Sequence, residues 1–440
     1  MTNILVSLLT GLLPLYVVRF NVFGIPTNVF EVAVWATAAS WLAGKTLGVN
    51  AKTPSVEETS GFRAIPKSTL IFIALFILSA IISTTISSEL RNSLGILKGW
   101  IITPILFGLL VHTSTDKKAI IRSLILSGLV VALFGFSQIH GFNRIYSVYD
   151  VPNSLALFLV PTSVLAAWLG VKNTDKFYKY AAIVMLIAIV LTQSLGAIVA
   201  LVGTVIAGTV LASRTHPLQL PLEKGERTFV TPPLFKGRMG GVQKRLFLEI
   251  FIMGIIAILF FTLSGRFSYL ISPLIHPNTT NSVTVRMQLW DIGAELIKKH
   301  PILGIGLGQF EPAYQAELHR RFAEEACGEK STQPCLPAGR YKLQAEYVFR
   351  DPHNWIISFW LNTGLLGLLS FIGLNYIAIT KSLPSPVLGE GGGEGKTVYR
   401  QAIALAIISI LIFGLFDTIY WKNDLSALWW ILLAYSLPLI

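Results

Sequence analysis

An arginine and a histidine stand near the two ends of the longest polar stretch of the chain. This stretch covers residues 265–354, and runs of apolar residues with short breaks make up the chain on both sides of it. Arg286 lies near its beginning, and a guanidinium can hold a phosphate group through two parallel hydrogen bonds. His353 lies at its end, and an imidazole can accept a proton from a hydroxyl group near neutral pH. The two residue types together predict anion binding and proton transfer.

The sequence around Arg286 predicts a helix that begins at Val283 and ends before Pro301. Ser282 can cap its start, and lysines suit its last turn. Apolar residues recur at spacings of four and three, as they do along one face of a helix: Val283, Met287, Trp290, Ala294 and Ile297. We expect this face to lie on a bilayer surface or to pack over the other helices.

Three glycines follow this helix, at Gly304, Gly306 and Gly308. A glycine-rich loop can surround a phosphate, but this one opens no strand–helix unit of the kind that binds dinucleotides. We therefore expect these glycines to allow close backbone packing or a tight turn.

The residues around His353 predict the start of another helix. Asp351 suits the N-cap and Pro352 the first helical position. His353 would then lie in the first turn, where the positive end of the helix dipole disfavours an imidazolium. We expect a neutral His353 that accepts a proton, and Asp351 either caps the helix or orients the ring. A histidine that serves structure alone is the alternative.

Both cysteines of the chain lie in the polar stretch, in CGEKSTQPC at Cys327 and Cys335. A disulfide between them would close a short loop and stabilise the fold by ~2–3 kcal/mol. Two unpaired thiols in a loop are the alternative.

The composition predicts an all-α polytopic membrane protein. Hydrophobic residues make up 53% of the chain and charged residues only 13%, whereas about 25% of a soluble protein is charged. A bilayer span needs about 20 mostly apolar residues. About twelve such spans are expected, near residues 4–22, 28–44, 68–86, 92–113, 119–139, 153–171, 179–193, 195–213, 246–264, 355–380, 400–417 and 423–440. The seventh and eighth are barely separated and could form a merged or re-entrant pair.

This assignment divides the chain into three parts. Spans one to nine occupy residues 1–264, the long polar segment occupies residues 265–354, and the last three spans occupy residues 355–440. Two breaks rich in Pro, Gly and charge, at 214–245 and 384–395, show no helical or strand periodicity. We expect both to be flexible cytoplasmic insertions.

The net charge of +12 follows from membrane topology and makes nucleic acid an unlikely partner. With both termini in the cytoplasm, the cytoplasmic breaks hold twenty lysines and arginines, and the short outer breaks hold four. This asymmetry obeys the positive-inside rule. It places the long polar segment outside, where an oxidising compartment permits a disulfide.

Two cations lie near predicted span ends. Arg144 lies in an outer break with Gln138, Tyr149 and Asn153, where it either faces an anion or sits at the interface beside a capped turn. Lys98 lies within the fourth predicted span, where a functional role is one interpretation. We favour an interfacial lysine whose ammonium reaches water.

The combined motifs resemble the O-antigen ligase/polymerase family. The resemblance is carried by RMQLWDIGAELIKKHPILGIGLGQF at 286–310 and, after a polar loop, by DPHNWIISFWLNTGLLGLL at 351–369. It also covers the long outer segment, the break at 138–153 and the twelve-span plan, and so most of the chain.

The resemblance implies a GT-C-like fold and an inverting glycosyl transfer without metal or cofactor, on the outer face of the bacterial inner membrane. A polyprenyl-diphosphate-linked glycan would be the donor, and a lipid A core, a glycan or a protein the acceptor. His353 would take the proton of the acceptor hydroxyl or position that hydroxyl, and Arg286 would hold the diphosphate. The remaining candidates for substrate binding are Arg144, Arg266, Arg350, Asn354 and Trp290.

The chain departs from the family pattern at the start of the eighth predicted span. Ligases of the family often have Ser-Arg-Gly there, whereas this chain has Ser194-Leu195-Gly196. Arg144, Arg266 or Arg350 would have to supply the second positive charge. The alternatives are a membrane transporter, because some family members have been labelled bicarbonate transporters, and a catalytically inactive relative.

Overall fold

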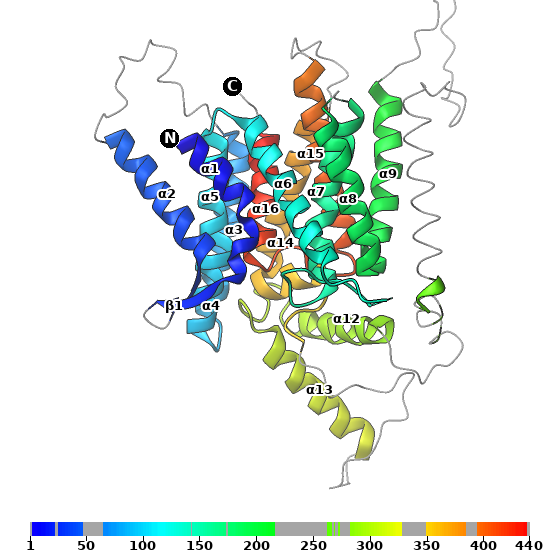
Figure 1. Ribbon diagram of the computed structural model, residues 1–440. Coiled ribbons are helices and arrows are strands. Elements are labelled where there is room, and N and C mark those ends of the chain that lie inside the picture. Colours follow the sequence, from blue (N-terminus) through cyan, green and yellow to red (C-terminus); the bar gives the residue numbers. More distant parts are fainter. Residues whose placement is uncertain are drawn as a thin grey trace, which may run out of the picture.

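The protein is an upright bundle of helices with one helix lying across its end. The computed structural model describes residues 2–22, 25–46, 65–141, 143–172, 175–215, 262–265, 268, 272, 282–327, 349–383 and 394–437. Helix α12 (Ser282–Lys299) crosses beneath the bundle, and α13 (Phe310–Cys327) leads away from it (Figure 1). Helix α1 (Thr2–Gly11) begins and α16 (Asn423–Ser436) ends at the opposite end of the bundle.

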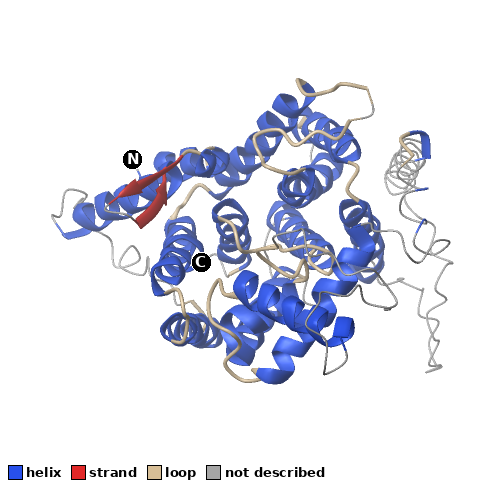
Figure 2. Cartoon of the chain, turned by 90° about the horizontal axis from the view of Figure 1, so that it is seen from below, coloured by secondary structure: helices blue, strands red, loops and turns tan. Residues whose placement is uncertain are grey.

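The remaining helices of the bundle agree closely with the apolar runs of the sequence. They are α2 (Val29–Thr46), α3 (Lys67–Thr85), α4 (Leu90–Ile96), the π-helical turn η3 (Leu97–Ile102), α5 (Thr103–Thr113), α6 (Lys117–Phe136), α7 (Pro152–Lys172), α8 (Lys176–Thr192), α9 (Leu195–Thr215), α14 (Trp355–Ser382) and α15 (Glu394–Phe413). Helices α4 and α5 continue into each other through η3. Viewed from below, most of these helices are seen end-on (Figure 2).

Five helices among the described residues are long and apolar enough to cross a membrane. They are α3, the continuous helix Leu90–Thr113, α6, α7 and α14. This finding confirms the all-α membrane class, while the count of twelve spans stays a prediction. Residues 216–245 and 384–393 of the two insertions, most of the predicted span 246–264 and Cys335 lie outside what the structure describes. Cys327 is the last residue of α13, so the disulfide stays a prediction.

The predicted first span, 4–22, is wrong as a single helix. Helix α1 ends at Gly11, and a 3-10 turn, η1 (Leu13–Val17), follows with Pro14 in its first turn. Glycine and proline both disfavour continuation of a helix, which explains this end. The chain then forms a hairpin in which β1 (Arg19–Val22) pairs antiparallel with β2 (Ile25–Asn28). The hairpin lies at the edge of the bundle (Figure 2).

Helices α8 and α9 are two separate elements, not a merged span. Gln193 follows α8 in the left-handed conformation, with φ of 50°. Its backbone N–H bonds to the carbonyl of Val190 at 3.0 Å, and α9 begins two residues later. A left-handed residue at this position is a common helix C-terminus.

The core of the bundle is an aromatic cluster around α14. Phe359 and Phe371 stack with ring centroids 3.9 Å apart. Tyr420 and Trp429 contact Phe371 at 5.7 and 4.8 Å. This cluster fixes α14 against α16 and against the connection that precedes α16. The start of α14 and this connection carry the polar residues described in the next subsection.

Lys98 makes an ion pair near the bundle end, and its side chain is 28% exposed. Its ammonium lies 2.8 Å from a carboxylate oxygen of the buried Glu31 and donates to the carbonyl of Pro26 at 2.7 Å. The other Glu31 oxygen accepts from Asn423 at 2.7 Å. This network joins the hairpin, α2, η3 and α16.

Helix α14 is broken at Gly364, and the glycine loop (residues 301–309) fills the break. Gly364 has φ 68° and ψ −177°, which are not helical. The freed carbonyl of Leu361 accepts from Ile305 at 2.9 Å, and the N–H of Leu365 donates to the Ile302 carbonyl at 2.9 Å. Such a break is tolerated within a bundle only where the freed groups find partners.

The glycines of this loop are required by space and by conformation. Gly304, Gly306 and Gly308 all have positive φ. A Cβ on Gly304 would overlap the Leu361 carbonyl, and one on Gly308 would overlap Ile96. The sequence-based expectation of close backbone packing is confirmed.

We predict that Gly304→Ala destabilises the protein by roughly 2–5 kcal/mol, through positive-φ strain plus overlap with α14. Gly141→Ala is the matched control, because Gly141 also has positive φ but no atom of the described residues lies within 4 Å of the position that a Cβ would take. The control should lose only roughly 1–2 kcal/mol. Thermal unfolding of the purified full-length protein measures both variants, and equal losses would contradict the packing explanation.

Candidate functional site

Asp417 is the centre of a polar network at the end of the bundle nearest α12. It lies in the connection between α15 and α16, and its side chain is only 7% exposed. Its carboxylate accepts from the N–H of Thr418 at 2.8 Å and from the carboxamide of Asn153 at 3.1 Å. The Asp417 network, as we name it, comprises His353, Asp417, Asn153, Arg144 and Arg286.

His353 contacts Asp417 directly. Its Nδ1 lies 2.9 Å from Oδ1 of Asp417 and 3.6 Å from Oδ1 of Asp351. An Nδ1–H that donates to Asp417 leaves Nε2 as the free ring nitrogen, and Nε2 bonds to no residue that the structure describes. The side chain is 31% exposed, so solvent and ligands can reach it.

The backbone at His353 corrects the predicted helix start. His353 has φ of 50°, and its N–H donates to Oδ1 of Asp351 at 3.0 Å. The same oxygen accepts from the Thr418 hydroxyl. Asp351 therefore stabilises this turn and is not the N-cap, and Pro352 lies outside the helix.

The N-cap of α14 is Asn354. Its carboxamide oxygen accepts from the backbone of Ile356 and Ile357 at 3.0 and 3.2 Å, and its amide donates to the Leu415 carbonyl at 3.1 Å. These bonds tie the start of α14 to the connection that carries Asp417.

The two carboxylates beside His353 favour its protonated form at neutral pH. Burial alone would lower the pKa of His353, but the carboxylates of Asp351 and Asp417 outweigh this effect and raise the pKa to about 9. The neutral imidazole that the sequence predicted is therefore not the favoured form at neutral pH. The prediction did not include Asp417, the second carboxylate beside the ring.

Asp417 is correspondingly held as an anion. Burial would raise the pKa of its carboxyl, but the charge of His353 and their hydrogen bond, together with Arg286, hold that pKa well below its usual range. In this pair the negative charge of the buried Asp417 is balanced by the partly exposed imidazolium of His353.

Arg286 approaches the same carboxylate from α12. Its Nη2 lies 3.9 Å from Oδ2 of Asp417, its Nε donates to the Phe416 carbonyl at 2.8 Å, and its Nη1 donates to the Ser282 carbonyl at 3.1 Å. The side chain is 21% exposed. The structure thus brings Arg286 and His353 together, although 66 intervening residues separate them in the sequence.

Arg144 joins the network through Asn153. Its Nη2 donates to Oδ1 of Asn153 at 2.8 Å, and its Nε donates to the Thr192 carbonyl at 2.7 Å. Thr192 lies three residues before Leu195, the position of the family arginine. A guanidinium from a different part of the chain therefore lies next to the end of α8 that leads to Leu195.

The predicted apolar face of α12 packs only in part, because Trp290 and Ile297 are partly buried against a small core while the rest of the face is exposed. Val283 and Met287 are 37% and 52% exposed, and Ala294 is also exposed. The buried residues are Gln288, Leu289, Ile292, Gly293 and Leu296. This second face packs against α13 and α14, where Gln288 donates to the Tyr314 hydroxyl at 2.6 Å.

The other predicted site residues have different surroundings. Trp290 donates to the His353 carbonyl at 3.4 Å and so lies beside the network. Arg350 is 86% exposed and lies 3.9 Å from Glu311. Arg266 lies outside the residues that the structure describes.

A cluster of charges fixes α13 to α12. The Glu317 carboxylate, 4% exposed, accepts from Lys299 at 2.7 Å and also pairs with Arg320 and Arg321. The hydrogen bond from Arg320 is the largest of the effects that lower the pKa of Glu317 to about 2, so this carboxylate stays charged. The cluster steadies the helix that carries Arg286.

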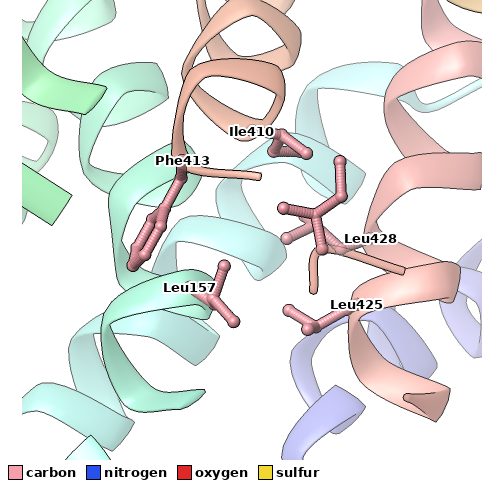
Figure 3. Close-up of a pocket in the computed structure, with 6 residues that line it drawn as sticks. Leu157, Ile410, Phe413, Leu425 and Leu428 are labelled. Atoms are coloured by element: carbon pink, nitrogen blue, oxygen red, sulfur yellow. The ribbon is translucent and has the colours of Figure 1, made fainter. Parts of the chain in front are cut away.

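An apolar pocket lies beside the network, between α7, α15 and α16 (Figure 3). Its lining residues are Leu157, Ile410, Phe413, Ile419, Leu425 and Leu428. It has no volume that a water molecule could occupy. We therefore regard it as a packing defect of the core and not as a binding site.

Sequence reasoning missed Asp417. Its position inside the predicted span 400–417 carried a signal, because an ionisable residue at the end of an apolar run is a functional candidate. Its partners lie far away in the sequence, and only the fold shows them. In the part of the chain that the structure describes, no group of three or more His, Cys, Asp or Glu side chains could hold a metal ion.

Comparison with known proteins agrees with the motifs. A search among curated proteins gives no match. A family model described as O-antigen ligase matches residues 180–372, a range that includes Arg286 and His353 but neither Arg144 nor Asp417. The part of the chain from α8 to the middle of α14 is therefore O-antigen ligase-like, as the sequence motifs predicted.

Proposed function

We propose that the protein transfers a glycan from a polyprenyl-diphosphate carrier to an acceptor hydroxyl at the outer face of the bacterial inner membrane. The observation that carries this proposal is the contact of His353 and Arg286 with the same buried carboxylate, Asp417. A proton acceptor and an anion-binding group are thereby held side by side. The O-antigen ligase match supports the reaction class.

In the proposed reaction the acceptor oxygen attacks the anomeric carbon of the donor sugar. The bond between that carbon and the diphosphate oxygen breaks, and the diphosphate leaves with the electron pair. A single displacement of this kind inverts the anomeric centre. The acceptor proton passes to Nε2 of His353, and Asp417 stabilises the imidazolium that forms, since a carboxylate on Nδ1–H favours the charged ring.

Arg286 is proposed to bind the diphosphate. Its Nε and one Nη1 hydrogen are used by backbone carbonyls, which fix the plane of the guanidinium. Its contact with Asp417 is long, at 3.9 Å, so the remaining hydrogens can bond to phosphate oxygens. Stabilising charge on the leaving group in this way contributes ~3–4 kcal/mol in comparable sites.

We propose Arg144 as the second cation of this member. Its hydrogen bond to Asn153 connects it to Asp417, and its bond to Thr192 brings it towards the position of the family arginine. Arg350, by contrast, is almost fully exposed. Arg286 and Arg144 together would bring two guanidinium groups to this network, and each can bind phosphate oxygens.

The break in α14 is a feature that would favour the transporter alternative, since broken helices line transporter sites. Here the freed backbone groups at Leu361 and Leu365 bond to the glycine loop. They are therefore not available to a transported ion. A catalytically inactive relative would show no glycan transfer by the wild-type protein.

We predict that His353→Ala lowers the transfer rate by ~10²–10⁴-fold, because it removes the proton acceptor. Arg286→Ala should lower the rate by ~10²–10³-fold through lost charge stabilisation. The measurement is transfer by the purified full-length protein in nanodiscs, with a polyprenyl-diphosphate oligosaccharide as donor.

Two further variants decide between the candidate arginines. Arg144→Ala should weaken donor use, and Arg350→Ala should leave the rate within about threefold of wild type, as expected of an exposed side chain. A gel of surface polysaccharide from cells tells the reaction types apart: loss of all long chains indicates a ligase, and single-repeat products indicate a polymerase. An unchanged transfer rate in His353→Ala would refute the proposed enzyme mechanism.

We predict that the transfer rate rises with pH up to about pH 9. Because the pKa of His353 is raised to about 9, only about 1% of the ring is neutral at pH 7, and this fraction grows as the pH approaches 9. Asp417→Asn removes one cause of the raised pKa. It should move the rising limb to lower pH and reduce the maximum rate. A rate that falls between pH 7 and 9 would show that His353 acts as a cation and not as a base.

A further inference from the structure

A groove lies at the same end of the bundle as the Asp417 network, but on the side of the hairpin. It runs between β2 and the start of α4, with a volume of about 520 Å³. Five residues line it: Pro26, Glu89, Leu90, Arg91 and Asn92. Helix α4 and the hairpin stand next to each other at the lower edge of the bundle (Figure 1).

The groove contains one acidic and one basic side chain, Glu89 and Arg91, which do not pair with each other. Glu89 is the N-cap residue of α4, yet its side chain caps no backbone N–H. Neither Glu89 nor Arg91 forms a side-chain hydrogen bond or ion pair with any residue described in the structure. Residues two apart at a helix start do not face each other, so the two charges address separate points of the groove.

The walls of the groove are fixed in place. The Lys98 ammonium holds the Pro26 carbonyl at 2.7 Å on one side. On the other side the hydroxyl of Ser93 donates to the Leu307 carbonyl at 2.6 Å, and that of Ser88 donates to Gln309 at 2.5 Å. A ligand would therefore meet a preformed site.

Exposed apolar side chains surround the groove. They are Phe20 and Val22 on the hairpin, Ile86 before α4, and Leu90 and Leu94 on α4, all between 40% and 52% exposed. On α3, Leu78 and Ile81 are also exposed, at 48% and 44%. Exposed leucine and isoleucine on a spanning helix are the surface that lipid chains cover.

We propose that this groove binds the head group of a phospholipid that carries a primary ammonium beside its phosphate diester. Arg91 binds the phosphate, as guanidinium groups do, and Glu89 accepts hydrogen bonds from the ammonium. The acyl chains lie along Leu94 and the apolar side of the hairpin. The proposal depends on the opposite charges in one groove and not on the glycosyl transfer.

The test compares two lipids on the purified full-length protein. Native mass spectrometry measures binding of phosphatidylethanolamine and of phosphatidylcholine with identical acyl chains, at equal concentration. The wild type should retain phosphatidylethanolamine about fivefold better, because only its ammonium can donate to a carboxylate. Glu89→Gln should reduce this preference towards one, and Glu89→Asp should keep it. Arg91→Ala should weaken both lipids.

Lys118→Ala is the control, because Lys118 is an exposed cation on a different helix, at the start of α6. It should leave the ratio of the two lipids unchanged. Equal retention of the two lipids by the wild type would overturn the proposal, as would an unchanged ratio in Glu89→Gln. The size-exclusion profile confirms that each variant is folded.

Discussion

A single buried carboxylate organises the end of the bundle nearest α12. Asp417 is 7% exposed, and a buried charge is tolerated only when it is paired and hydrogen-bonded. The partners come from five separate parts of the chain: His353 before α14, Arg286 on α12, Asn153 on α7, Thr418 next to Asp417, and Arg144 through Asn153. The requirement to neutralise Asp417 therefore brings together the groups that the proposed chemistry needs.

A second constraint fixes the distance between α12 and α14. The glycine loop leaves α12 and enters the break of α14 at Gly364, where backbone groups of each segment satisfy those of the other. Glu317 adds an ionic contact between α12 and α13. Arg286 and His353 thus lie on helices that are tied together away from the network, so its geometry does not depend on the ion pairs alone.

The sequence predicted the elements that carry the site better than it predicted their contacts. The bounds of α12 and the end at Pro301 were confirmed, because caps and a proline signal them locally. The fully buried face of α12 was not predicted, because α12 has apolar residues on two sides and its contacts with α13 and α14 decide which side is buried. The conformation of His353 was missed for a similar reason: its positive φ depends on Asp351 and Thr418. No local pattern connects Asp417 to a residue 64 positions away.

The titration of His353 tests the central claim most directly. Full-length protein with isotope-labelled histidine, in nanodiscs, gives the pKa of each of the seven histidines by nuclear magnetic resonance, and His353→Gln identifies the signal. We predict a pKa of about 9 in the wild type and a lower pKa in Asp417→Asn. A wild-type pKa near the ordinary value of 6.5, unchanged in Asp417→Asn, would contradict the claim that Asp417 organises the site.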